Sequence, residues 1–520
     1  MKICSNPKRS TRRLLTGNRQ PLLALATAVE LLKGARLPVA IRPHPNNVSA
    51  RTLLSCQIMD SYHLALRRTL RFIALFIIIV IPVPGLHAQQ AAAEPPASSS
   101  ANSNPEFLAT ADEVLQEMSE ITGWKLKQPL KKTIRSRAEI RAYVIHQMDD
   151  EKDAKERYAS AKSAEAFGLV PKGFDFDSFL VDLLTEQIAG LYDPKTHEFY
   201  IADWITPADQ RMVMSHELTH ALQDQYFQIE PWVKAARPND DAELAREAVL
   251  EGSAMAGMLE YMLKDKGLKL QELPDIDPSV FVGDLSDTPM LKKAPPFIKD
   301  SLMFPYFSGL SFSMSVLRSG GWPSFSSVFA RPPADTQQIM HPEIYRAAKV
   351  PAALHTDLPA NTPDDTWSKL EENSLGEFGW KEVLKQYLDE DRAKTTAAAW
   401  DGDDYITFEQ KDSKRLMLFT RIRLANLDAT AHFFGQYSEV LEKKYPDHHH
   451  LFRRPDFFSF TASSGPVFLR CFERECITLE GGNRALFLQW NQKLGWEAIP
   501  EEPKKPDDQD IKSTQVLFAR

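Results

Sequence analysis

A chain of 520 residues, 43% of them hydrophobic, can bury at least one large core, and its length predicts two domains. The formal net charge of −8 is spread along the chain without a basic block. Nothing in the composition therefore indicates binding to nucleic acid.

The first 88 residues predict a leader that directs the chain to export. Three arginines between residues 67 and 71 precede the apolar run 72–83, and small residues follow as far as Ala88. These are the parts of a signal peptide, and the apolar run is short for a bilayer span, although an uncleaved anchor is the alternative. We expect a periplasmic or secreted protein that touches the membrane only through such an anchor, with Met59 as an alternative start of translation.

Two segments rich in proline and polar residues predict the domain boundaries. Residues 89–105 are expected to form a disordered linker, and residues 350–365 contain three prolines and form a second linker. The boundaries predict one domain over residues 106–349 and a smaller α+β domain over residues 366–520.

Hydrophobic spacing in the first domain favours helices. Apolar residues three and four apart predict helical structure over residues 106–163 and a second helix over 176–188. A short strand is expected at Phe199–Ile201, after an Asp-Pro turn. Thr206 as N-cap and Pro207 at the first helical position then predict the start of a long helix.

That helix carries H-E-L-T-H, residues 216–220, a match to H-E-x-x-H. His216 and His220 lie one turn apart on one face, so both imidazoles can reach a zinc ion at about 2.0 to 2.1 Å. Glu217 then stands beside the open coordination position, where it can take a proton from zinc-bound water.

A third ligand is expected on a helix over residues 240–261, capped by one of its first two aspartates. This helix places Glu243, Glu247 and Glu251 on one stripe, which ordinarily means a solvated surface, and we expect that for at least one of them. Glu251, however, lies within an apolar run, where an unpaired carboxylate is costly. A metal ion would remove that cost.

H-E-L-T-H-A-L followed by L-E-G-S-A resembles the gluzincin metallopeptidases, the group that contains thermolysin and the zinc aminopeptidases. The resemblance implies a mainly helical zincin-like core with a short antiparallel edge sheet. It also implies Zn²⁺ held by His216, His220 and Glu251, with Glu217 as the catalytic base. An E-x-x-x-D pattern would make Glu247 the ligand instead; we favour Glu251, with Glu247 as partner of a histidine.

A wider likeness covers residues 106–349. G-L-Y-D-P, F-P-Y-x-x-G and P-P-A-D-T-Q-Q-I-M-H-P-E-I-Y accompany the zinc motif, and the set resembles poorly characterised exported bacterial proteins. Gluzincins often stabilise the oxyanion with a Tyr or His from beyond the third ligand. His341 is the first candidate for that role, followed by Tyr345 and Tyr306, although each could instead pack or shape a loop.

The C-terminal domain shows no catalytic constellation. Its pattern predicts strands at 404–411 and 415–425, a helix at 428–445 and a hairpin within 466–490, and a solvated loop is expected at His448–His450.

Cysteine usage agrees with export. Cys4 and Cys56 lie in the leader, so Cys471 and Cys476 are the only pair in the mature chain and are expected to form a disulfide.

The favoured hypothesis is an exported zinc peptidase that acts on a peptide or protein substrate, with Phe199–Ile201 as an edge strand along which extended substrate could pair. The alternative is a non-catalytic zincin-like binding or chaperone module in cell-envelope assembly. The intact Glu217 argues against that alternative.

Overall fold

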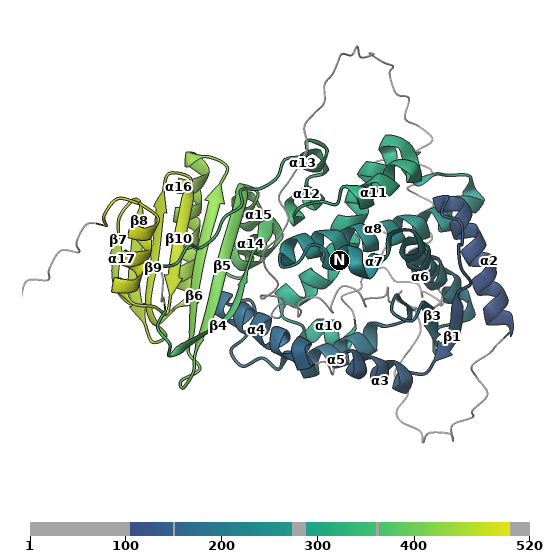
Figure 1. The fold of residues 1–520 in the computed structure, drawn as a ribbon, viewed down its shortest axis with the longest axis horizontal. Coiled ribbons are helices and arrows are strands. Elements are labelled where there is room, and N and C mark those ends of the chain that lie inside the picture. The colour runs from purple at the N-terminus through teal and green to yellow at the C-terminus, as the bar shows by residue number, and fades with distance from the viewer. Residues whose placement is uncertain (1–104, 149–150, 273–287, 360–362, 500–520) are drawn as a thin grey trace, which may run out of the picture. The chain divides into compact units, whose positions relative to one another are not determined.

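The computed structural model describes residues 105–148, 151–272, 288–359 and 363–499. They belong to one compact unit and form an α+β protein in which helices dominate as far as Arg346 and an antiparallel sheet follows (Figure 1). The expected leader and the expected linker at 89–105 lie outside the described residues, except for Pro105, which begins the first helix. Within the described ranges, no helix is long and apolar enough to cross a membrane.

The first helical stretch is interrupted, so the prediction of helix throughout 106–163 is wrong in its middle. Gly123, at a φ of +76°, follows the first helix, and a strand lies between that helix and the next. This strand forms because it pairs with a segment more than sixty residues later, which local spacing does not reveal. The elements are α2 (Pro105–Thr122), β1 (Lys131–Arg135), α3 (Arg137–Met148), α4 (Glu151–Phe167) and α5 (Phe176–Gln187).

A small mixed sheet stands beside these helices. It contains β1, β2 (Gly190–Asp193) and β3 (Glu198–Ala202) in the order β1-β3-β2, with β1 parallel and β2 antiparallel to β3. The expectation of an edge strand at Phe199–Ile201 is therefore wrong, because β3 is the central strand and all five of its residues are buried. Extended substrate cannot pair with a strand that already has two neighbours.

The predicted motif helix and third-ligand helix both form. They are α6 (Pro207–Phe227) and α8 (Asp240–Leu263), joined through α7 (Ile229–Lys234). Thr206 is the N-cap of α6, but its hydroxyl donates to the Asp209 carboxylate at 2.5 Å and not to backbone. Asn239, and neither predicted aspartate, caps α8, since its Oδ1 accepts from Ala242 N at 2.9 Å.

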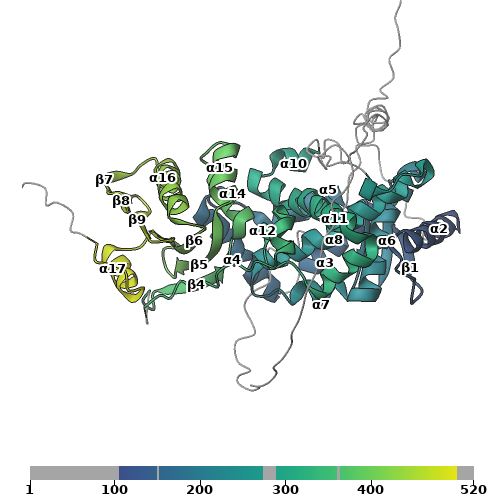
Figure 2. The ribbon, with the colours of Figure 1, turned by 90° about the horizontal axis from the view of Figure 1, so that it is seen from above.

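The helix α11 (Pro296–Ala330) crosses α8 in backbone contact, and α8 also packs against α6 (Figure 2). A Cβ built on Gly252 of α8 would lie 2.0 Å from the carbonyl carbon of Gly309 on α11. A Cβ on Gly309 would lie 2.1 Å from the Ala248 carbonyl oxygen. Only glycines at this crossing allow the two helices to approach so closely.

The remaining helices that the structure describes in this part are short. They are two 3₁₀ turns, η3 (Lys264–Lys266) and η4 (Leu270–Glu272), and three α-helices, α10 (Pro289–Lys293), α12 (Thr336–Met340) and α13 (Pro342–Arg346).

The second sheet has seven strands, all antiparallel, in the order β4-β5-β6-β10-β9-β8-β7 (Figure 1). The strands are β4 (Trp367–Asn373), β5 (Trp400–Gln410), β6 (Leu416–Leu424), β7 (His449–Arg453), β8 (Phe457–Ala462), β9 (Gly465–Phe472) and β10 (Glu475–Glu480). The helices of this part are α14 (Gly376–Lys385), α15 (Glu390–Ala397), α16 (Leu427–Lys444) and α17 (Arg484–Lys493).

Most predicted elements of this part are confirmed, namely β5, β6 and α16. The hairpin within 466–490 exists as β9 and β10, but it ends at Glu480 and α17 follows. The loop expected at His448–His450 is wrong, because His449 and His450 open the edge strand β7, where both remain exposed.

Helices cover both faces of this sheet. Along β5, Ile406 and Phe408 pack into a core that includes Trp490 of α17. The intervening Thr407 faces α4, where it accepts a hydrogen bond from Ser163 Oγ at 2.9 Å. The alternation follows from the two-residue repeat of a strand.

The disulfide prediction is confirmed. Cys471 on β9 and Cys476 on β10 are directly opposite in the register, with Cα atoms 4.0 Å apart, and their sulfurs are bonded.

The glycine crossing of α8 and α11 gives a stability prediction. Gly252→Ala should lower the free energy of unfolding by about 1–3 kcal/mol, because the new methyl group meets backbone atoms that cannot move independently. Urea unfolding measures this change. Gly435→Ala is the control: its Cβ meets nothing within 4 Å on α16, so it should stabilise by about 0.5–1 kcal/mol. Equal effects of the two substitutions would contradict the close crossing.

Candidate metal centre

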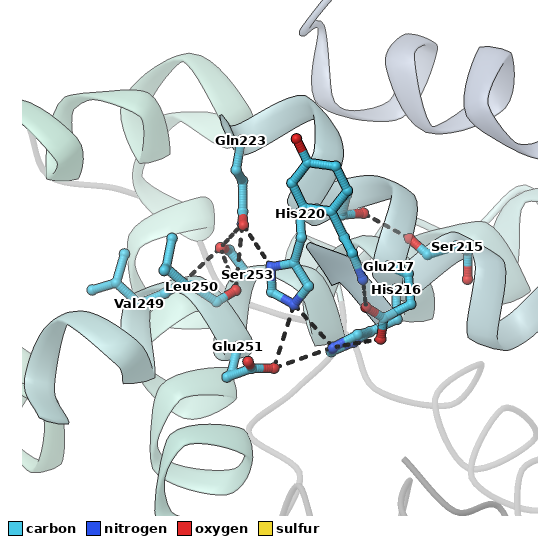
Figure 3. Close-up of polar contacts among 11 residues, drawn as sticks. Ser215, His216, Glu217, His220, Gln223, Val249, Leu250, Glu251 and Ser253 are labelled. Carbon is cyan, nitrogen blue, oxygen red and sulfur yellow. Dashed lines mark hydrogen bonds and ion pairs between the residues drawn. The ribbon is translucent and has the colours of Figure 1, made fainter. Parts of the chain in front are cut away.

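Two histidines of α6 and one glutamate of α8 converge in the helical part of the protein (Figure 3). The Nε2 atoms of His216 and His220 are 3.2 Å apart. Glu251 Oε2 lies 3.2 Å from the first and 3.5 Å from the second. The three donor atoms all lie within 4.8 Å of one another, a separation suited to binding one metal ion.

The cluster is buried. His216, His220 and Glu251 are 1%, 8% and 5% exposed, and Glu217 is 2% exposed. Ionisable groups are rarely buried to this degree unless they are paired or coordinate a metal.

A hydrogen-bonded chain fixes the orientation of His220. The ring Nδ1 lies 2.8 Å from Gln223 Oε1, and Gln223 Nε2 donates to Ser253 Oγ at 2.7 Å (Figure 3). Because the amide nitrogen already donates to Ser253, its oxygen accepts from Nδ1–H. Nε2 of His220 is therefore the nitrogen left to bind a metal.

Glu217 stands next to the cluster and outside it. Its Oε2 accepts a hydrogen bond from the Tyr192 backbone N at 3.0 Å, so β2 of the small sheet holds this carboxylate. Its Oε1 lies 3.9 Å from His216 Nε2 and has no hydrogen-bond partner among the described residues. One oxygen is thus anchored, and the other is available for chemistry.

Burial and charge set the protonation of these groups. Burial raises the pKa of Glu217, and the two neighbouring imidazoles oppose that effect. Burial also acts to raise the pKa of Glu251, but His220 and His216 outweigh it and lower the pKa to about 2. Burial acts to lower the pKa of His220, but the charge of Glu251 raises it to about 9. Glu251 is therefore ionised at neutral pH.

The acidic stripe of α8 is not a solvated surface, which corrects that expectation. Glu243 and Glu247 are 3% and 4% exposed. The Glu243 carboxylate lies 3.3 Å from Arg237 Nη2. Glu247 is not a member of the His-His-Glu group, and Glu251 is. The geometry favours Glu251 as the third ligand.

His341 and Tyr345 make their described contacts elsewhere. His341 Nε2 lies 2.8 Å from Glu377 Oε1 on α14, and Tyr345 Oη donates to the Arg331 carbonyl at 2.8 Å. Sequence position placed both beyond the third ligand, but α12 and α13 direct these side chains into contacts with α14 and the end of α11. Neither contact joins these side chains to the His-His-Glu cluster, so the expected oxyanion role of His341 and Tyr345 has no support in the geometry.

Tyr306 is the third candidate, and it lies at the cluster. Its ring stacks on His216 with centroids 6.1 Å apart and planes inclined by 27°. Burial raises the pKa of Tyr306 well above its usual range, and the negative charges of Glu251 and Glu217 add to the effect. Its hydroxyl therefore stays protonated and can act as a donor.

Three supporting residues were missed from the sequence. Gln223 lies three residues after His220 on the same helix, and Ser253 two residues after Glu251, so their spacing was a usable signal. Tyr192 acts through its backbone, and its hydroxyl donates to Asp224 Oδ2 at 2.7 Å. No side-chain pattern indicates a backbone donor.

A cavity of about 890 Å³ lies away from this centre. Its lining includes Lys172, Tyr387, Arg415 and Glu480, but no member of the cluster. Volume alone therefore does not identify the candidate site.

Fold and site together define an α+β protein with a buried His-His-Glu cluster suited to binding a divalent metal. No protein family, curated protein or solved structure matches this chain.

The cluster predicts which substitutions remove metal. His216→Ala with His220→Ala should leave one zinc fewer per chain than the wild type, measured by elemental analysis of the purified protein. Glu251→Ala should have the same effect, whereas Glu247→Ala should weaken affinity only about 10- to 100-fold. The reverse pattern for the two glutamates would assign the third ligand to Glu247.

The His341 contact predicts a pH-dependent stability term. The hydrogen bond to Glu377 raises the pKa of His341 in the folded state. The contribution of the His341–Glu377 pair to the free energy of unfolding should be complete below the pKa of histidine in the unfolded chain, about 6.5. It should be lost as pH rises through the pKa of His341 in the folded state. The free energy of unfolding of the wild type should be higher than that of His341→Gln, and this difference should be larger at pH 5.5 than at pH 9. His432→Gln is the control, because that ring contacts the Thr396 hydroxyl and forms no ion pair with a carboxylate of the described residues. A His341 difference that does not change with pH would contradict the pairing.

Proposed function

We propose that the protein is an exported zinc-dependent peptidase with a zincin-like core. The supporting observation is the convergence of His216, His220 and Glu251, with Glu217 next to them. The H-E-x-x-H spacing and the order of the elements support the same proposal.

The residues fit a zinc ion. Two imidazole nitrogens and one carboxylate oxygen are the donor set of many catalytic zinc sites, and these three atoms already lie close together. Gln223 orients one imidazole, as partners of metal-binding histidines commonly do. Zinc bound there would supply a Lewis acid that polarises the substrate carbonyl and acidifies water.

The chain's own residues perform the proton transfers. Glu217 accepts a proton from the water that attacks the carbonyl, and then delivers a proton to the leaving amine. Its anchored Oε2 fixes the direction of the free Oε1. The Tyr306 hydroxyl donates a hydrogen bond to the carbonyl oxygen that becomes negative when water attacks.

The substrate in this proposal is a peptide or protein of the cell envelope or medium. The arginine-flanked apolar run before Ala88 supports export. The disulfide of Cys471 and Cys476 also fits an oxidising compartment.

One observation favours the non-catalytic alternative. The cluster residues are at most 8% exposed, a degree of burial that also suits a metal ion with a purely structural role in a binding or assembly module. Structural zinc sites usually fill all four positions with protein ligands, however, and among the described residues this cluster supplies three.

Glu217→Gln separates the two functions. The amide keeps the size and the Tyr192 contact but cannot accept a proton, so cleavage of an unfolded protein should fall by about 10²- to 10⁴-fold while zinc content stays unchanged. Proteolysis with and without chelator measures this. Glu260→Gln, a change of the same kind on α8 outside the cluster, should retain wild-type cleavage.

Two results would contradict the peptidase proposal. One is unchanged cleavage by Glu217→Gln. The other is zinc-loaded wild type that cleaves nothing while Glu217→Gln fully complements a deletion strain, which would favour the assembly module.

A further inference from the structure

A second group of metal-ligand residues lies on the seven-stranded sheet, apart from the candidate metal centre. His355, Glu372 and Asp404 each offer a donor atom, and the three atoms lie within 4.8 Å of one another. They come from three chain segments: the stretch 350–359, which has no regular secondary structure, and the strands β4 and β5.

Strand register brings the two carboxylates together. Glu372 on β4 is directly opposite Ile406 on β5, and Asp404 precedes Ile406 by two residues, so both acids are on one face of the sheet. Side chains two apart on neighbouring strands lie within reach of each other. The pairing of the strands, and not the flexibility of a loop, sets this proximity.

Hydrogen bonds on both sides hold His355 over this face. Ala352 N donates to the Asp401 carbonyl at 2.7 Å, and Thr356 N donates to Asp404 Oδ2 at 2.5 Å. The His355 carbonyl itself accepts from Arg421 Nη1 at 2.8 Å. The backbone that carries the imidazole is therefore fixed next to the carboxylates.

A neighbouring contact fixes the same stretch from the other side. Trp490 Nε1 of α17 donates to the Thr356 carbonyl at 2.6 Å, and Thr356 is 1% exposed. Thr356 thus anchors the stretch to the core of the sheet, while His355 beside it stays exposed.

The basic side chains near His355, Glu372 and Asp404 pair with other carboxylates and not with Asp404. Asp404 is 7% exposed and forms no ion pair with a basic side chain of the described residues. Arg421, opposite it on β6, pairs with Asp357 and Glu475, while Lys369 pairs with Glu372. The Glu372 and Asp404 carboxylates offer ligand atoms within 4.8 Å of each other, and a bound cation would relieve their mutual repulsion.

We propose that His355, Glu372 and Asp404 bind a divalent transition-metal ion that fastens residues 350–359 to the sheet. One imidazole with two carboxylates suits Mn²⁺ or Zn²⁺, whereas Ca²⁺ and Mg²⁺ prefer oxygen ligands alone. The stretch follows α13 and precedes β4, so the ion stabilises the connection between the helical part and the sheet.

The test uses the full mature chain carrying His216→Ala and His220→Ala, which removes the candidate zinc ligands of α6. This protein should still bind about one Mn²⁺ per chain, followed by electron paramagnetic resonance, and Mn²⁺ should raise its melting temperature. Adding His355→Ala should abolish both effects. Because His355 is exposed, its loss should leave the fold intact, and Glu372→Gln provides a second variant.

Asp357→Asn is the matched control, since this carboxylate contacts Arg421 near the group but is not a member of it. It should retain Mn²⁺ binding. Absence of binding in the His216→Ala, His220→Ala protein, or binding unaffected by His355→Ala and Glu372→Gln, would overturn the second site. Neither result tests the candidate metal centre on α6, because the protein used already lacks His216 and His220.

Discussion

The contact between Glu251 and the imidazoles of His216 and His220 is the interaction on which the candidate site depends. A buried carboxylate without a partner would cost several kcal/mol, and here two histidines of another helix lie within 3.5 Å. That contact can form only because α6 and α8 pack together. The fold thus keeps three ionisable groups in a buried cluster where a metal ion can bind them.

The surroundings of α8 extend the same constraint. Gly252 follows Glu251 directly and touches α11 at Gly309, three residues beyond Tyr306. The close crossing of α8 and α11 therefore fixes the positions of Glu251 and Tyr306 relative to each other. On the opposite side, Tyr192 of β2 fixes Glu217. Helix packing positions His216, His220 and Glu251, and the small sheet positions Glu217.

The sequence predicted what depends on short spacing. Two histidines four apart lie on one helical face by geometry, and an acid within an apolar run must have a partner. The α6 and α8 helices and the residues of the cluster followed from this. The sequence did not reveal that β1 pairs with β3, because that pairing joins residues such as Lys131 and Glu198 that are far apart in the chain. His341 failed for a similar reason: its partner Glu377 lies on α14, beyond the predicted domain boundary.

The pairing of β1 with β3 limits how the N-terminus of this protein can be processed. Phe107 of α2 stacks on Phe199 of β3 with ring centroids 6.1 Å apart, and β1 supplies one of the two neighbours of β3. The other neighbour is β2, whose Tyr192 N holds Glu217. The helix α2 and all three strands of this sheet begin at or after Pro105. Cleavage past Arg135 would remove β1, one neighbour of the central strand β3, and would weaken the sheet that holds Glu217 without altering any residue of the cluster.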